Sequence, residues 1–170
     1  MATAPLTRRG ALATALAAPA ILVGISATPA SAAGRSGREL LQAFLDTLSA
    51  HDLTAFRALY VDDGYVQHQA LVTNAPSAAN GPDTAVAYFR TRIEAFPDLR
   101  VRSDVSLFEG NRIAANLIWS GTHEGAYLGV RATGRKVVFN STDIMTTRDG
   151  LFSEHWGVAD LYGLLAQLRA

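Results

Sequence analysis

Five side chains in this sequence could move a proton at neutral pH. They are His68, His123, Asp143, His155 and Asp160. The pKa of a histidine lies near neutrality, and partial burial raises the pKa of a carboxyl group toward the same range. A carboxylate next to an imidazole also orients the ring and increases its basicity. These residue types therefore predict general acid/base chemistry between a substrate and an aspartate or a histidine.

His123 and Asp143 are expected on the inner faces of two long strands. Side chains alternate along a strand, so residues two apart share a face. On each inner face apolar residues come first and polar ones follow, which is typical of a pocket with a polar mouth. The apolar residues expected to line this pocket are Trp119, Phe139 and Met145. His123 and Asp143 could pair for catalysis, or they could form a buried pair that only satisfies its own hydrogen bonds.

The other three candidates each have a structural interpretation beside the functional one. His155 and Trp156 are consecutive in a strand, so only one of them can face the pocket unless a bulge intervenes. We favour Trp156 as a packing residue that contacts substrate, and His155 as a residue of the pocket or of a dimer face. Asp160 could be a general acid/base or the N-cap of the last helix. His68 could line the mouth of the pocket or lie at a strand edge.

Composition and motifs exclude several other kinds of chemistry. The 170 residues contain no cysteine, which rules out disulfides, thiolate metal sites and cysteine nucleophiles. The four histidines lack the spacing of a metal site, and there is no Walker loop, dinucleotide fingerprint or G-x-S-x-G elbow. The 15 basic residues balance 15 acidic ones, so we expect no nucleic-acid partner. We also expect no metal and no cofactor.

Apolar periodicity predicts helices early in the domain and mostly strands after them. The period is close to four residues before Pro97 and two residues after it. Helices are expected at 38–49, 52–60, 83–96 and 160–168, with Asp52 and Asp83 as N-caps. Strands are expected at 65–68, 99–108, 113–123, 136–146 and 151–158, with a surface loop at 74–82. This order indicates an α+β fold in which a curved antiparallel sheet wraps on helices and leaves an internal pocket.

Residues 1–32 have the pattern of an export signal. Two arginines at 8–9 precede an uncharged apolar stretch at 11–25, and Ala30-Ser31-Ala32 fits a cleavage site. The arginine pair resembles a twin-arginine signal, and an ordinary secretory signal is the alternative. The apolar stretch is short and interrupted by a proline and a glycine, so no stable membrane anchor is expected after processing. We expect a secreted domain at 33–170.

Several motifs, in order along the chain, resemble those of SnoaL-like polyketide cyclases. The most specific is Glu154-His155-Trp156-Gly157-Val158-Ala159-Asp160, followed by Gly163-Leu164-Leu165. Weaker ones are Tyr65-Val66-Gln67-His68, Phe96-Pro97-Asp98, Gly121-Thr122-His123 and Asp143-Ile144. The similarity spans 40–168. It implies a cone of the nuclear-transport-factor-2 kind, often a homodimer, and ring closure by intramolecular aldol condensation without metal or cofactor.

The resemblance also implies that an aspartate near the end of the last strand acts as general acid/base. Family members often carry an acidic residue directly after His-Trp, where this sequence has Gly157. The acid is therefore either missing, or its role falls to Asp160. A second departure is Arg131-Ala132-Thr133-Gly134, where Pro-Pro usually precedes Thr-Gly.

The leading hypothesis is a secreted, cofactor-free cyclase, or a related lyase or isomerase, that acts on a small, largely apolar carbonyl compound. In it Asp160 moves the proton, and His123 and Asp143 polarise or orient the reacting groups. His155 is the remaining catalytic candidate. The substrate contacts would come from His68, Trp119, Phe139, Met145 and Trp156. The alternatives are an extracytoplasmic binding protein for apolar small molecules and a structural dimer of the same fold.

Overall fold

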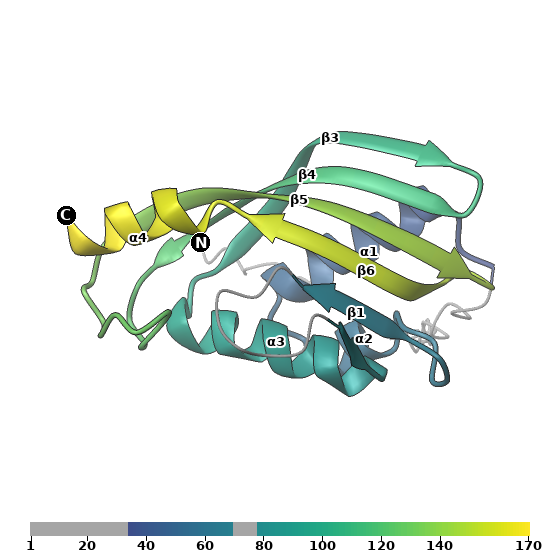
Figure 1. Ribbon diagram of the computed structural model, residues 1–170, viewed down its shortest axis with the longest axis horizontal. Coiled ribbons are helices and arrows are strands. Elements are labelled where there is room, and N and C mark those ends of the chain that lie inside the picture. The colour runs from purple at the N-terminus through teal and green to yellow at the C-terminus, as the bar shows by residue number, and fades with distance from the viewer. Residues whose placement is uncertain (1–33, 70–77) are drawn as a thin grey trace, which may run out of the picture. The chain divides into compact units, whose positions relative to one another are not determined.

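A computed structural model describes residues 34–69 and 78–170 of the chain (Figure 1). The predicted export signal and residues 74–77 of the predicted loop lie outside this part. Within the two described segments, no helix has both the length and the apolar character needed to cross a membrane.

Helix α1, Gly37–Ser49, forms where the sequence predicts it and begins with a capping box. The Ser36 hydroxyl accepts a hydrogen bond from the Glu39 N–H, and the Glu39 carboxylate accepts one from the Ser36 N–H. The apolar stripe of the helix is buried, and its members are Leu40, Leu41, Phe44, Leu45 and Leu48. Burial of this stripe stabilises α1 more than its intrinsic helix propensity does.

Aspartate side chains cap the short helix α2, Leu53–Arg57, and the last helix α4, Leu161–Arg169. Asp52 accepts a hydrogen bond from the Ala55 N–H at 2.9 Å, which confirms the predicted cap of α2. Asp160 accepts one from the Gly163 N–H at 2.8 Å in the same way. Each cap satisfies a helix N–H that would otherwise lack a partner.

Helix α3, Pro82–Ala95, begins differently from the prediction. Gly81, with φ of 89°, is its N-cap, and Pro82 takes the first helical position, where a missing N–H costs nothing. Asp83 lies in the first turn and pairs with Arg57 at 2.9 Å. The expectation that Asp83 caps this helix is therefore wrong.

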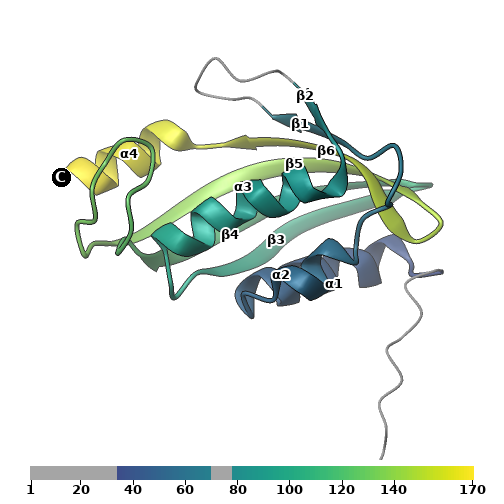
Figure 2. The ribbon, with the colours of Figure 1, turned by 90° about the horizontal axis from the view of Figure 1, so that it is seen from below.

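Within the described residues, six strands form one sheet in the order β2-β1-β6-β5-β4-β3. Their bounds are β1 Val66–Gln69, β2 Ala78–Asn80, β3 Arg100–Glu109, β4 Arg112–Thr122, β5 Lys136–Arg148 and β6 Leu151–Ala159. The four long strands form the predicted antiparallel meander, whereas β1 pairs in parallel with β6. Figure 1 and Figure 2 show α1 and α3 on the same face of the sheet. The α+β class with a curved sheet over helices is confirmed.

The expected alternation along the long strands is also confirmed. On the inner face of β4 and β5 the buried residues are Ile113, Ala115, Leu117, Trp119, Val137, Phe139, Ser141, Asp143 and Met145. Most of this face joins the hydrophobic core beneath α1 and α3. Polar residues interrupt it only where β5 and β6 run beside one another, and there the site lies.

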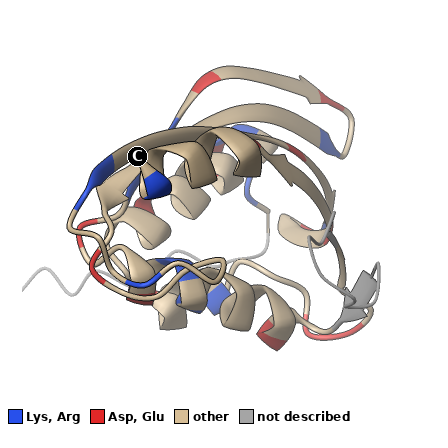
Figure 3. Ribbon diagram, turned by 60° about the vertical axis from the view of Figure 1, so that its left-hand side comes forward, with Lys and Arg blue, Asp and Glu red and all other residues tan. Residues whose placement is uncertain are grey.

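The outer face of the sheet carries exposed apolar side chains. They are Val105, Leu107, Val138, Ile144, Trp156 and Val158. Figure 3 shows both acidic and basic positions along the ribbon in this view. The described part of the chain thus offers exposed apolar side chains on the outer face of the sheet.

Candidate functional site

A small cavity lies between α3 and the inner face of the sheet. It is lined by Gln67, Tyr88, Phe89, Arg92, Ser141, Asp143, His155, Gly157 and Ala159. Its volume is about 20 Å³, enough for roughly one water molecule. The lining comes from β1, α3, β5 and β6, so four separate elements must pack together before the site exists.

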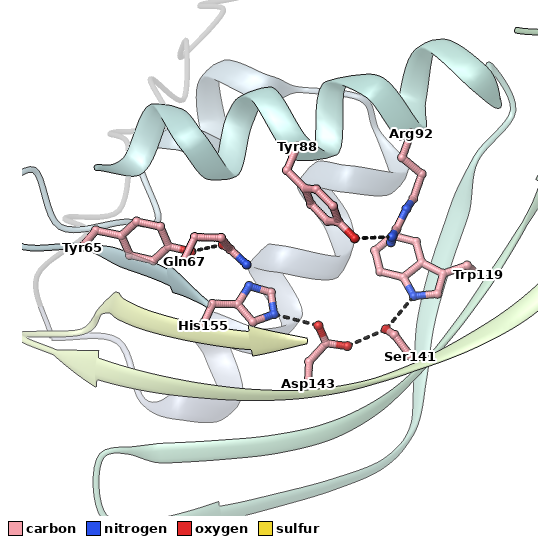
Figure 4. Close-up of polar contacts among 8 residues, drawn as sticks. All are labelled: Tyr65, Gln67, Tyr88, Arg92, Trp119, Ser141, Asp143 and His155. Atoms are coloured by element: carbon pink, nitrogen blue, oxygen red, sulfur yellow. Dashed lines mark hydrogen bonds and ion pairs between the residues drawn. The ribbon is translucent and has the colours of Figure 1, made fainter. Parts of the chain in front are cut away.

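Hydrogen bonds join four buried side chains along the floor of this cavity (Figure 4). The Trp119 Nε1–H donates to Ser141 Oγ at 2.9 Å, and the Ser141 hydroxyl donates to Asp143 Oδ2 at 2.5 Å. Asp143 Oδ1 lies 2.7 Å from His155 Nε2. Because an indole N–H can only donate, the Ser141 hydrogen is free to point at Asp143. The chain of hydrogen bonds therefore has a fixed direction that ends on the carboxylate.

Asp143 and His155 form a buried pair whose side chains are only 6% and 2% exposed. Asp143 accepts from Ser141 at one oxygen, and as a carboxylate it accepts from the His155 Nε2–H at the other. His155 Nδ1 has no hydrogen-bond partner in the described chain. The Asp143–His155 hydrogen bond thus fixes the carboxylate and the imidazole relative to each other.

Arg92 brings a positive charge to the opposite wall of the cavity, reaching it from α3 (Figure 4). It is 2% exposed, and its guanidinium donates to the hydroxyls of Tyr88 and Tyr127 at 2.8 and 3.3 Å. Its Cζ lies 4.4 Å from the centre of the Trp119 ring. Among the ion pairs of the described residues none includes Arg92. A buried cation without a carboxylate partner is costly, so its place beside the cavity suggests a role in binding.

Two tyrosines and a glutamine complete the polar surroundings. Burial raises the pKa of Tyr65, and burial also raises the pKa of Tyr88 although Arg92 opposes that shift. Both hydroxyls therefore stay protonated at neutral pH. The Tyr65 hydroxyl donates to Gln67 Oε1. The amide nitrogen of Gln67 consequently points away from Tyr65, toward His155 (Figure 4).

The family model for SnoaL-like polyketide cyclases matches residues 38–168. This chain belongs to that family. Solved structures with the same fold include TsrD from Streptomyces laurentii, which is 28% identical, with a TM-score of 0.67 over 77% of this chain and 92% of that chain. IdmH from Streptomyces antibioticus, a candidate polyketide cyclase, is 23% identical, with a TM-score of 0.70 over 78% and 98%. AclR from Streptomyces galilaeus, a candidate hydroxylase, is 23% identical, with a TM-score of 0.69 over 78% and 80%. A comparison with curated proteins finds no match.

In this SnoaL-like chain Asp143 pairs with His155 rather than with His123. Asp143 lies opposite Ala115 on β4, whereas His123 follows the far end of that strand. His123 is fully buried, with Nδ1 3.0 Å from Thr133 Oγ1. Burial lowers the pKa of His123. The expectation that His123 and Asp143 form one pair is therefore wrong, because strand register separates them.

Three other predicted site residues lie away from the cavity. Asp160 is exposed and serves as the N-cap of α4, the structural alternative to its catalytic role. His68 and Trp156 stack on each other on the outer side of the sheet, with ring centres 4.3 Å apart and parallel planes. Glu154 lies 3.4 Å from the His68 ring. His155 faces inward and Trp156 outward, as alternation requires, so the expectation that Trp156 and His68 line the inner pocket is wrong.

The predicted apolar lining is buried in the core instead of around the cavity. Trp119, Phe139 and Met145 are each at most 3% exposed, and none of them lines the free space. Trp119 still acts on the site, because it donates to Ser141 and supports the Arg92 guanidinium. The large hollow expected from the apolar strand faces is filled by side chains of the helices.

Sequence reasoning missed Arg92, Tyr88, Gln67 and Ser141. Ser141 shares the predicted inner face with Asp143, so alternation could have included it. Arg92 follows Phe89 by three residues on the buried stripe of α3, and a cation on such a stripe is a usable signal. Gln67 carries no such signal, because it reaches the site only through the parallel pairing of β1 with β6.

Proposed function

We propose that this exported SnoaL-like domain catalyses cofactor-independent proton transfer on a small, largely apolar carbonyl compound, leading to ring closure or isomerisation. Asp143 is the proton acceptor and donor, in place of Asp160. The observation that carries the proposal is the arrangement around one cavity. A carboxylate oriented by His155 and Ser141 lines it together with Arg92, a guanidinium outside any ion pair of the described residues.

Charge balance favours a neutral carbonyl substrate. Asp143 and Arg92 give the buried site one negative and one positive charge. When Asp143 takes a proton from the carbon next to the carbonyl, the carboxylate becomes neutral and the substrate oxygen becomes an enolate. The enolate then faces Arg92, so the net charge of the buried site does not change. Preserving net charge matters, because an uncompensated charge in a low-dielectric interior is strongly unfavourable.

The steps after enolate formation use only the proton that Asp143 has taken from the substrate. In a ring closure the enolate carbon attacks a second carbonyl of the same molecule, forming a carbon–carbon bond and an alkoxide. Asp143 returns its proton to that alkoxide, which restores the carboxylate. In an isomerisation the proton returns to a different carbon. His155 and Ser141 keep the carboxylate oriented, and Arg92 stabilises the oxygen that gains charge.

The size of the cavity limits what enters. A space of about 20 Å³ holds no carbonyl compound unless side chains move. Tyr88 and Arg92 form the α3 side of the cavity, and Tyr88 is half-buried rather than enclosed. Phe89 makes part of the same wall apolar. The substrate should therefore be small and enter on the α3 side.

Deuterium exchange at the carbons next to the carbonyl of cyclohexanone in D₂O, followed by proton NMR, tests the proposal. The wild-type chain should accelerate exchange, and Asp143→Asn should lose about 100-fold or more of that rate. Asp160→Asn is the matched control, since Asn caps a helix about as well as Asp. It should keep the rate within about twofold. Loss in Asp160→Asn with full activity in Asp143→Asn would return the role to Asp160.

A carrier of the same fold is the second candidate. The lining favours it, because the buried Arg92 guanidinium and the Tyr88 hydroxyl could hold a carbonyl oxygen whether or not Asp143 moves a proton. In that case cyclohexanone binds saturably by NMR titration, but the wild-type chain does not accelerate exchange. The same samples thus separate an enzyme from a carrier.

A further inference from the structure

We infer that Gly157 is a positioning residue whose missing side chain leaves the space that the Asp143 carboxylate occupies. This inference rests on the proposed function of Asp143 as the proton carrier. It assigns to Gly157 a direct role in setting the Asp143–His155 pair, although the residue has no side chain of its own.

The two residues face each other across the ladder of β5 and β6. Asp143 is the register partner of Gly157, and both line the cavity. A Cβ placed on Gly157 would lie 2.7 Å from Asp143 Oδ1 and 3.6 Å from His155 Nε2. Ordinary Cβ contacts are longer than about 3.4 Å. The atom that would be displaced is therefore the oxygen that binds His155.

The glycine is needed for space and not for backbone conformation. Gly157 is absent from the glycines of positive φ in the described chain, and it lies within the regular ladder of β6. An alanine therefore fits the backbone at this position. The methyl group of that alanine would instead displace the Asp143 carboxylate.

This geometry also means that the carboxylate can be supplied from either strand. The Asp143 side chain crosses from β5 into the volume above residue 157 of β6. A carboxylate carried at 157, with residue 143 shortened, would enter the same cavity between His155 and Arg92. The two positions are alternative attachments for one acid, and they exclude each other sterically.

Gly157→Ala tests the inference by two independent readouts on the full chain. The first is the His155 imidazole in ¹⁵N-detected NMR, where a protected Nε2–H marks the bond to Asp143. It should be present in wild type and lost in Gly157→Ala. The second is cyclohexanone exchange, which should fall about 10-fold or more. Val158→Ala, on the exposed face of the same strand, is the matched control and should change neither.

Three further variants, all carrying Asp143→Ala, guard against simple misfolding. The Gly157→Ala change should lower the Tm of the wild-type chain by several degrees, but by less than about 2 °C in an Asp143→Ala background, where no carboxylate is displaced. The exchange rate lost in Asp143→Ala should rise about 10-fold or more when Gly157→Asp is added.

The possible results separate the positioning role of Gly157 from the proposed function of Asp143. A retained Nε2–H signal in Gly157→Ala, or an equal Tm loss in both backgrounds, overturns the positioning role. Absence of exchange in the wild-type chain refutes the proposed function alone, because the NMR signal and the Tm comparison still decide the role of Gly157.

Discussion

Arg92 should contribute much less to stability than its contacts suggest. Arg92→Met keeps the apolar stem and removes the charge, whereas Arg92→Lys keeps the charge and removes the planar fork. The guanidinium makes two hydrogen bonds to tyrosine hydroxyls and lies 4.4 Å from the Trp119 ring. Charge-assisted hydrogen bonds contribute about 1.5–3 kcal/mol each, and a desolvated cation–π contact contributes about 2 kcal/mol. The desolvation of a buried ion, at several kcal/mol, offsets most of this gain.

Arg92→Lys should therefore be less stable than Arg92→Met, although lysine keeps the positive charge. Arg92→Met should lower the free energy of unfolding by about 2 kcal/mol or less, because the charge leaves together with its desolvation cost. Arg92→Lys should lower it by about 3 kcal/mol, because an ammonium is more strongly hydrated and cannot stack on Trp119. In a domain of this size each 1 kcal/mol changes Tm by roughly 4 °C.

Urea unfolding followed by tryptophan fluorescence measures both free energies. Cyclohexanone exchange on the same samples should show that Arg92→Met loses about 100-fold in rate, since it has no group to stabilise the enolate oxygen. The reasoning is refuted if Arg92→Lys is as stable as wild type while Arg92→Met loses more than about 4 kcal/mol. That order would mean that the cation is present for stability.

Two more predictions follow from burial. Because burial lowers the pKa of His123, the unfolded chain binds a proton below about pH 6.5 that the folded chain refuses, so stability is lost as pH falls through that value. The drop in Tm between about pH 8 and 5.5 should shrink in His123→Asn, and an unchanged drop would contradict this. The exposed apolar residues of the outer sheet face, Ile144 at 47% and Trp156 at 38%, predict a homodimer through that face. Light scattering should give a dimer for wild type and a monomer for Ile144→Lys; a wild-type monomer would exclude this interface.

Local pattern predicted most of the elements, because the forces that select them act over a few residues. The stripe of α1 and its capping serine lie within one stretch of chain, as do the alternating strands around the turn at 109–112. The N-cap of α3 was missed, since Pro82 and the positive φ of Gly81 outweigh the cap preference of Asp83. Alternation also placed Asp143 on an inner face, but it left open whether His155 or Trp156 turns inward, and Asp143 was expected to pair with His123.

The site itself depends on pairings between distant segments. Asp143 meets His155 because β5 and β6 pair in one particular register, and Gln67 joins them because β1 adds in parallel to β6. Arg92 closes the cavity because α3 packs over that part of the sheet. None of these three contacts follows from the order or spacing of the residues.

The sequence alone thus determined which side chains of β4 and β5 turn inward, since the period of a strand is a property of the local backbone. It also carried the family, whose motifs lie along nearly the whole domain. Only the tertiary structure decided which inward-facing groups meet and how little space they leave. It also decided that the absence of a side chain at Gly157 leaves room for the Asp143 carboxylate. Those outcomes depend on strand register and close packing, where a shift of one residue exchanges the two faces of a strand.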